Sequence, residues 1–274
     1  MFKDKVAVVT GGGSGIGEAI CQQLASDGAF VYVAGIQRDQ VDTVVDKITS
    51  EGGTAIAACF DVTDYSEYAT FVTDVVETSG RIDYLFNNAG VTLISELKDT
   101  AIEHCAETMN TNFFGVLNGI NLIYPIMARQ GFGHIVNTAS LAGILGYPTS
   151  AVYAASKGAV IVLSKSLRYE AKAFGVKVSV ACPGYVETAI FRQERILGAS
   201  VDSIIDGLPF TMISAEQAAR AILRGVQKNK ANIIFPFYAR VITFLGMLCP
   251  VLLKSKYEEV ISSFRSDSSA GPKS

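Results

Sequence analysis

The feature that most constrains this chain is the alternation, from the first residues onward, of short apolar runs with segments of helical period. Residues 6–10 and 30–34 have the composition of buried strands, and residues 18–26 and 40–50 have the apolar spacing of helices. Further strands are expected at 55–60, 84–87, 134–138 and 177–181, and further helices at 66–79, 101–129, 151–174 and 215–227. This alternation predicts a single-domain α/β fold with a doubly wound parallel sheet in three α/β/α layers.

The composition allows one sizeable core and argues against several kinds of site. Of the 274 residues, 49% are hydrophobic and 18% charged, and the net charge is −3, so nucleic acid is not an expected partner. The 5 scattered cysteines and 2 histidines argue against a disulfide framework or a metal site, and favour a cytoplasmic location. The first residues run directly into an apolar strand, so no signal peptide is expected.

A glycine-rich turn, "VVTGGGSGIG", joins the first expected strand to the first expected helix. Gly11, Gly15 and Gly17 give the spacing GxxxGxG. This spacing differs from the common GxGxxG fingerprint, but its glycines act for the same physical reasons. Glycines permit a tight turn and let backbone N–H groups approach a pyrophosphate at a helix N-terminus. The position of this turn in the chain predicts a Rossmann-like nucleotide site, in which Ser14 and Ile16 also take part.

A second pattern, "SAVYAASKGAV", places Tyr153 and Lys157 four positions apart, on one face of an expected helix. Taken alone, the two residues could equally well be a surface contact on a helix or a catalytic pair. An opposite charge within about 4–6 Å lowers a pKa by roughly 1–3 units, so a lysine beside a tyrosine favours the phenolate. The pair is therefore a candidate acid/base.

Together with further motifs in the same order, the chain resembles the short-chain dehydrogenase/reductase family. The motifs are Thr10–Gly17 "TGGGSGIG", Asp61–Val62 "DV", Asn87–Gly90 "NNAG", Asn112 in "NTNFFG", Ser140, "YAASK" from Tyr153 to Lys157, and Pro183–Thr188 "PGYVET". They span roughly the first 190 residues. The resemblance implies an oxidoreductase that interconverts a carbonyl and a secondary alcohol with NAD or NADP.

The resemblance also implies roles for single residues. Ser140, Tyr153, Lys157 and Asn112 correspond to the catalytic tetrad, in which Tyr153 exchanges the proton, Ser140 binds the substrate oxygen, Lys157 also binds the nicotinamide ribose, and Asn112 holds a water. The residues implied to bind the cofactor are Gly11, Ser14, Gly15, Ile16, Gly17, Arg38, Asp61, Val62, Asn88, Gly90, Tyr153, Lys157, Pro183, Gly184, Val186 and Thr188. For Asn87, binding to nearby backbone is an equal alternative.

The choice between NAD and NADP stays open at this point. Gly35 stands where an NAD enzyme usually has an acid, and neither Ile36 nor Ser14 supplies the basic residue of many NADP enzymes. Asp39 is expected to cap the next helix. Without the acid, nothing repels a 2′-phosphate and Arg38 is within reach of one, so NADP is weakly favoured.

The substrate is expected to be hydrophobic. The segment of about 188–212, where the family places its substrate loop, carries Phe191, Ile196, Leu197, Ile204, Ile205, Leu208 and Phe210, and Leu141, Ile144, Leu145 and Tyr147 lie between Ser140 and Tyr153. These residues serve equally well as core. A steroid-like, acyl-chain or aromatic carbonyl or alcohol fits them better than a sugar.

By composition, residues 1–230 are expected to form the nucleotide-binding and catalytic domain, 231–265 an apolar extension, and 266–274 a disordered tail. The segment 232–253 is strongly apolar but is interrupted by Pro236 and Pro250, and its unbroken part is too short to span a bilayer. It is expected to cover the substrate site, to pack in an oligomer interface, or to lie on a membrane surface with Arg240 and Lys254 at the headgroups.

Three functions therefore compete. The first is an NAD(P)-dependent oxidoreductase for a hydrophobic substrate, expected to form a homodimer or homotetramer through the helices that begin near 101 and 151. The second is a reductase for lipids or steroids, peripheral to a membrane. The third is a cofactor-sensing protein that keeps the fold without turnover.

Overall fold

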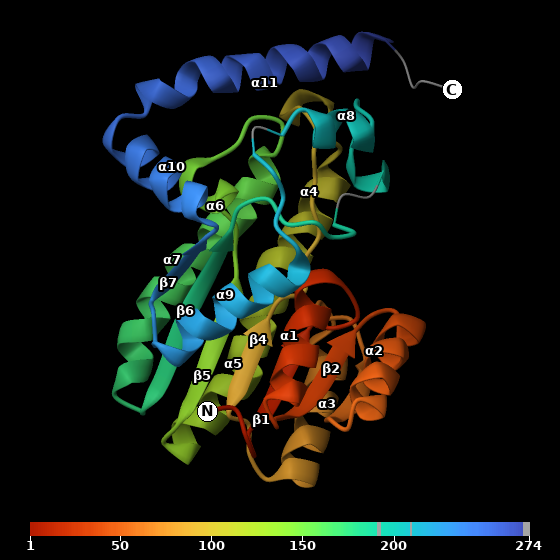
Figure 1. Cartoon of the computed structure of the whole chain (residues 1–274), viewed down its shortest axis with the longest axis vertical. Coiled ribbons are helices and arrows are strands. Elements are labelled where there is room, and N and C mark those ends of the chain that lie inside the picture. Colours follow the sequence, from red (N-terminus) through yellow and green to blue (C-terminus); the bar gives the residue numbers. More distant parts are fainter. Residues whose placement is uncertain (191–192, 209, 271–274) are drawn as a thin grey trace.

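The structure, a computed structural model, describes residues 1–190, 193–208 and 210–270. Seven parallel strands form one sheet in the order β3-β2-β1-β4-β5-β6-β7 (Figure 1). They are β1 (Val6–Thr10), β2 (Phe30–Gly35), β3 (Thr54–Cys59), β4 (Tyr84–Asn87), β5 (Gly133–Thr138), β6 (Val176–Pro183) and β7 (Asn232–Phe235). The doubly wound parallel sheet expected from the sequence is confirmed.

Helices cover both faces of the sheet, which explains why its central strands are apolar throughout. They are α1 (Gly15–Ser26), α2 (Arg38–Ser50), α3 (Tyr65–Ser79), α4 (Ile102–Met109), α5 (Gly115–Gln130), α6 (Ala142–Leu145), α7 (Ala151–Lys172), α8 (Val201–Asp206), α9 (Ala215–Gln227), α10 (Phe237–Leu248) and α11 (Val251–Ala270). One core cluster joins α1, α2 and α9 to the sheet, and a second joins α3, α5 and α7 to its other face. The three-layer arrangement is thus confirmed.

The helix expected over 101–129 is interrupted. α4 ends at Met109, a π-helical turn occupies Asn110–Phe114, and α5 begins at Gly115. A π-turn widens the helix by one residue and changes where its side chains point. This turn carries Asn112, whose side chain is fully buried.

The segment 231–265, expected to be an apolar extension, begins with a strand of the sheet. β7 pairs with β6, so the sheet extends beyond residue 230. α10 and α11 follow it, and α11 passes across the upper end of the molecule (Figure 1). Residues 266–270, expected to be disordered, belong to α11, and 271–274 lie outside the described residues. No single helix in the described chain is long and apolar enough to cross a bilayer; α10 and α11 pass that test only as a pair, bent by 112°.

Candidate active site

The expected site residues meet at the carboxyl ends of the strands. β1 lies between β2 and β4, so the crossover helices turn to opposite sides there, and ligands of such sheets bind in the crevice that results. Gly11 follows β1, Asn88 follows β4, Ser140 follows β5 and Gly184 follows β6. Residues from four separate motifs therefore lie along one edge of the sheet.

The glycine turn has the geometry that a pyrophosphate site needs. Gly11 and Gly15 adopt φ values of 63° and 54°, and a methyl group on Gly17 would lie 2.0 Å from the Gly11 carbonyl oxygen. Side chains at these positions would strain or block the turn. α1 begins at Gly15, directly after Ser14, so the first N–H groups of the helix point out of the turn. The residues present fit a dinucleotide phosphate.

Asn88 and Thr10 hold this turn against the sheet. The Thr10 hydroxyl accepts hydrogen bonds from the N–H groups of Asn88 and Ala89, each at 3.1 Å. The Asn88 amide donates to the Gly11 carbonyl at 3.4 Å and accepts from the Thr138 hydroxyl at 3.3 Å. Asn88 thus links β1, β4 and β5 at the expected adenosine side.

The residues expected at the adenine end lie after β2 and β3. The Asp61 carboxylate accepts a hydrogen bond from the Thr63 N–H at 2.8 Å, and Val62 is buried. Arg38 is the first residue of α2 and its side chain is 59% exposed, with Asp42 at 3.9 Å. Asp39 was expected to cap this helix, but the N-cap is Gln37, so that expectation is wrong.

Tyr153, Ser140 and Lys157 converge as the spacing suggested. Tyr153 and Lys157 lie on α7, one turn apart, and the ammonium is 5.9 Å from the centre of the Tyr153 ring. Ser140 and Tyr153 line the same cavity. Lys157, only 3% exposed, donates a hydrogen bond to the Thr138 carbonyl at 3.1 Å.

Glycines make room for this buried lysine. A methyl group on Gly90 would lie 3.1 Å from the Lys157 nitrogen and 3.0 Å from the Asn112 Oδ1. A methyl group on Gly143 would lie 2.6 Å from the Lys157 backbone. Small residues at 90 and 143 therefore let α7 and its lysine approach the sheet edge closely.

The pKa shifts differ from the sequence expectation. Burial raises the pKa of the Tyr153 phenol, and its hydrogen bond with Ser140 opposes that effect. Burial lowers the pKa of Lys157 to about 8. The expected lowering of the Tyr153 pKa is therefore not found in the protein alone, because burial disfavours the phenolate more than the contact with Ser140 favours it.

Asn112 is fixed by three hydrogen bonds. Its side chain accepts from the Val91 N–H at 2.8 Å and donates to the Val91 carbonyl at 2.9 Å and the Ser156 hydroxyl at 3.1 Å. Ser156 in turn donates to the Tyr153 carbonyl at 2.7 Å. Asn112 thus joins the chain after β4 to the α7 turn that carries Tyr153.

A cavity of about 430 Å³ opens beside Ser140 and Tyr153, and its wall is mostly apolar. Expected residues Leu141, Leu145, Tyr147, Ile204, Leu208 and Phe210 line it, together with Ile16, Pro183, Gly184, Val186 and Thr188 from the cofactor set. Ile144 and Ile196 pack in core clusters instead. Leu197 and Ile205 are not among the described residues of the wall, and Phe191 lies outside the described chain.

Covering the substrate site was one of the three roles expected for 232–253, and Tyr238, Ile242 and Leu253 of that segment do line the cavity, but the rest of the outer wall was not expected. Tyr185, Tyr238 and Tyr257 line the cavity, and burial raises the pKa of each, which keeps the phenols neutral. α11 contributes Leu253, Lys256, Tyr257, Val260, Ser263, Phe264 and Asp267. The apolar residues of this set recur at helical spacings of three and four, a signal that the polar composition after residue 253 concealed.

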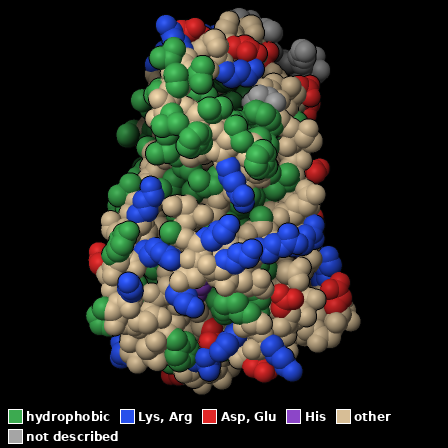
Figure 2. Space-filling view, turned by 60° about the vertical axis from the view of Figure 1, so that its left-hand side comes forward, with side chains coloured by type: hydrophobic (Ala, Val, Ile, Leu, Met, Phe, Trp, Pro, Cys, Tyr) green, Lys and Arg blue, Asp and Glu red, His purple; other side chains and the backbone are tan. Residues whose placement is uncertain are grey.

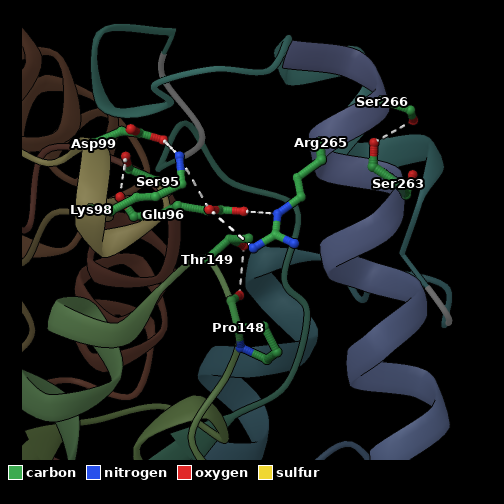
Figure 3. Close-up of polar contacts among 9 residues, drawn as sticks. All are labelled: Ser95, Glu96, Lys98, Asp99, Pro148, Thr149, Ser263, Arg265 and Ser266. Atoms are coloured by element: carbon green, nitrogen blue, oxygen red, sulfur yellow. Dashed lines mark hydrogen bonds and ion pairs between the residues drawn. The ribbon is translucent and has the colours of Figure 1, made fainter. Parts of the chain in front are cut away.

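Side-chain contacts fasten α11 over the cavity. Arg265 pairs with Glu96 in the loop before α4, and Figure 3 shows this pair bridging the two segments. The Tyr257 hydroxyl donates to the Gly146 carbonyl at 3.2 Å, and Ser203 of α8 donates to Asp267. Phe264 packs with Ile94 and Ile196 beneath the helix. α11 is therefore held along much of its length.

Comparisons with known proteins place this architecture in a family. Residues 5–196 match the model of the short chain dehydrogenase family. The chain is 31% identical over 254 residues to the 11-beta-hydroxysteroid dehydrogenase-like 4A protein of Arabidopsis thaliana, an alignment that covers 92% of this chain and 83% of the relative. It is 35% identical over 190 residues to an uncharacterised oxidoreductase of Staphylococcus aureus strain MW2, covering 69% and 81%.

Solved structures agree with this placement. A short chain dehydrogenase/reductase from Burkholderia phymatum in complex with NAD superposes with a TM-score of 0.80 at 28% identity, covering 94% of this chain and 95% of that one. An NAD+-bound xylitol dehydrogenase superposes with a TM-score of 0.76 at 27% identity, covering 85% and 98%. The chain belongs to the short-chain dehydrogenase/reductase family, a family of oxidoreductases.

Proposed function

We propose that this protein is an NAD(P)-dependent oxidoreductase that interconverts a carbonyl and a secondary alcohol on a hydrophobic substrate. The observation that carries the proposal is that Ser140 and Tyr153 meet in the wall of a largely apolar cavity, with the buried Lys157 ammonium 5.9 Å from the centre of the Tyr153 ring. The nicotinamide, when bound, supplies or accepts the hydride. The protein's own residues supply the proton and hold the reacting oxygen.

In the direction of reduction, the Tyr153 phenol donates its proton to the carbonyl oxygen. A raised pKa suits this acid role because it keeps the phenol protonated at neutral pH. Ser140 donates a hydrogen bond to the same oxygen and stabilises its developing charge. Once its proton has left, Tyr153 is a phenolate, which the nearby Lys157 ammonium stabilises. Asn112 links the chain after β4, through Ser156, to the backbone of Tyr153.

We assign the cofactor to the crevice between β1 and β4. The glycine turn of Gly11, Gly15 and Gly17 binds the phosphates, Asp61 and Val62 bind the adenine, and Lys157 binds the nicotinamide ribose. Thr188 is assigned to the nicotinamide end because it lines the cavity that also holds Ser140 and Tyr153. Arg38, exposed at the start of α2, favours the 2′-phosphate of NADP over NAD.

The apolar wall of the cavity favours a hydrophobic substrate. Leu145, Ile204, Leu208, Leu253 and Val260 offer no hydrogen bonds to a polyol, whereas an extended apolar molecule buries against all of them. The Arabidopsis relative is named after a hydroxysteroid and the structural neighbour after xylitol, and the apolar wall favours the former kind of ligand.

We also propose a homodimer or homotetramer that uses α5 and α7. Val160, Leu167 and Ala171 of the α7 stripe face the core, but Val162 and Tyr169 on its outer side are 64% and 82% exposed. Light scattering of the wild type and of a Tyr169→Glu variant tests this contact. A smaller species for the variant supports it, and an unchanged mass contradicts it.

The function is tested with Tyr153→Phe. The variant keeps the aromatic ring but lacks the hydroxyl that donates the proton. Turnover of hydrophobic ketones with NADPH or NADH therefore falls by roughly 10²–10⁴-fold, while cofactor affinity is retained. Tyr169→Phe, on the same helix and exposed, is the matched control and retains activity. Normal turnover by Tyr153→Phe contradicts the mechanism. A wild type that binds cofactor but reduces no carbonyl supports the cofactor-sensing alternative instead.

A further inference from the structure

α10 is apolar on both of its faces. Its inner side packs on the body of the protein, where Ala239 and Gly246 are buried and Ile242 lines the cavity. Its outer side carries Phe237, Phe244, Met247 and Leu248, which are 63–76% exposed. A helix that is hydrophobic all round is normally covered on every side. In α10 the outer side is exposed.

The exposed apolar surface continues over the bend into α11. Val251 and Leu252 are 75% and 59% exposed, and Val241 and Leu245 complete the surface on α10. We call these eight residues the elbow patch. They are eight of the twenty large hydrophobic side chains exposed in the described parts of the chain, gathered in one stretch of sixteen residues. Figure 2 shows hydrophobic side chains gathered over the upper part of the side of the molecule that it draws. Such a cluster marks an interaction surface.

Cations border the elbow patch on one side. Arg224, Lys228, Lys230 and Arg240 line a groove beside β7, and Figure 2 shows Lys and Arg side chains in a band below the hydrophobic area. Lys254, at the start of α11, pairs with Glu258 at 3.8 Å, so the positive charge comes mainly from α9 and the β7 side. An apolar surface with a cationic border complements a bilayer that contains anionic lipid.

A second copy of the chain fits this surface less well. β7 is an edge strand, but the Arg240 guanidinium donates to the Ile234 carbonyl at 2.7 Å, so this carbonyl already has a partner other than a second strand. A two-fold contact through the elbow patch would also bring two copies of the cationic band together, and like charges at a contact oppose association.

The geometry of α10 and α11 sets how a bilayer is met. α10 has 12 residues, about 18 Å of helix, against a hydrocarbon core of about 30 Å. α11 departs from it at 112°, so the pair forms an elbow and not a span. We propose that the elbow patch docks this protein on the surface of a bilayer containing anionic lipid, with the outer face of α10 in the acyl–headgroup boundary and the cationic band over the headgroups.

Docking places the cavity beside the lipid. Tyr238 and Ile242 of α10 and Leu253 and Tyr257 of α11 line it, so the helices that meet the bilayer are also the cavity wall. A carbonyl or alcohol dissolved in the lipid phase then reaches the site without crossing water. This consequence rests on the proposed function, whereas docking itself does not require turnover.

The test is flotation of the full-length protein with vesicles of phosphatidylcholine, alone or with phosphatidylglycerol. The wild type floats with the anionic vesicles, and Phe244→Glu/Met247→Glu lowers the floated fraction by about tenfold or more, because charged side chains do not enter the acyl region. Ile102→Glu, at an equally exposed site at the start of α4, is the matched control and floats as the wild type does. Lys228→Glu/Lys230→Glu lowers binding to the anionic vesicles only.

Three results overturn the proposal. One is a wild type that floats with neither vesicle, and another is equal flotation of Phe244→Glu/Met247→Glu. The third is a wild-type dimer in light scattering that becomes monomeric in that variant without any vesicle binding, which assigns the patch to a second copy. Circular dichroism and cofactor binding show that each variant is folded. Tyr153→Phe floats normally, which separates failure of docking from failure of the proposed reaction.

Discussion

The ammonium of Lys157 lies 5.9 Å from the centre of the Tyr153 ring, one helical turn away, and Lys157 is buried while Tyr153 is half-buried in the cavity wall. Burial acts on them in opposite senses, raising the pKa of the phenol and lowering the pKa of the ammonium to about 8. In the protein alone, Lys157 therefore loses its proton before Tyr153 does. Of the two, Lys157 is the group whose charge changes nearer to physiological pH.

Cofactor affinity should consequently depend on pH. Lys157 is charged below about pH 8 and neutral above it, so the dissociation constant of NADPH or NADH should rise as pH increases through that value. Fluorescence titration across that value measures the rise, and Lys157→Met should bind weakly with little pH dependence. A wild-type affinity that is constant over this range contradicts the assignment of Lys157 to the cofactor.

Cofactor preference should depend on Arg38. This side chain is 59% exposed and its contact with Asp42 is long, at 3.9 Å, so little holds it away from a 2′-phosphate. Arg38→Ala should weaken NADPH binding by about tenfold and leave NADH binding nearly unchanged, because only NADP carries the phosphate. Asp42→Asn, which removes the competing carboxylate, should bind NADPH at least as well as the wild type. Equal losses for both cofactors would place the 2′-phosphate elsewhere.

Asn112 should matter for stability as well as activity. Asn112→Ala removes three hydrogen bonds and leaves both backbone groups of Val91 without that partner, so the free energy of unfolding should fall by about 2–4 kcal/mol. Asn118→Ala, which removes a single bond to the Val62 carbonyl, is the control and should lose about 1 kcal/mol. Denaturant titration compares them. An Asn112→Ala protein as stable as the wild type would show that water replaces the amide without cost.

The Arg265–Glu96 pair should regulate how tightly α11 covers the cavity. The pKa of Glu96 is lowered, chiefly by its hydrogen bond with Arg265. Ionised Glu96 therefore contributes to the stability of the fold above the pKa that this carboxyl has in the unfolded chain. The contribution is lost as pH falls through its lower pKa in the folded protein. Glu96→Gln should speed hydrogen exchange over 251–267 severalfold at neutral pH, because it removes one of several side-chain contacts that hold α11 over the cavity.

A double substitution tests the latch itself. Glu96→Gln/Arg265→Gln should show no more exchange than either single variant, since all three lose the same contact. Additive effects would mean that the two residues hold α11 independently. The Lys256–Glu259 pair within α11, broken by Glu259→Gln, serves as the control and should leave exchange near the wild-type rate.

The alternation of apolar runs and helical periods predicted the layers, the parallel sheet and most element positions, because each signal is local. The motifs after β1, β4, β5 and β6 predicted one site for a similar reason: the carboxyl ends of parallel strands share an edge. The direction of the Tyr153 pKa shift was wrong because it depends on how completely other segments exclude water from the phenol. Spacing along one helix contains no measure of that exclusion.

The sequence by itself determined what is encoded over a few residues: strand, turn and helix, and which side chains α7 presents together. Only the tertiary structure decided that β7 joins the sheet, that α11 closes over the cavity from more than a hundred residues away in the chain, and that α10 leaves an apolar side exposed. Those outcomes depend on which surfaces meet after the chain folds back on itself. That is settled by burial and charge summed over distant segments, which no local pattern records.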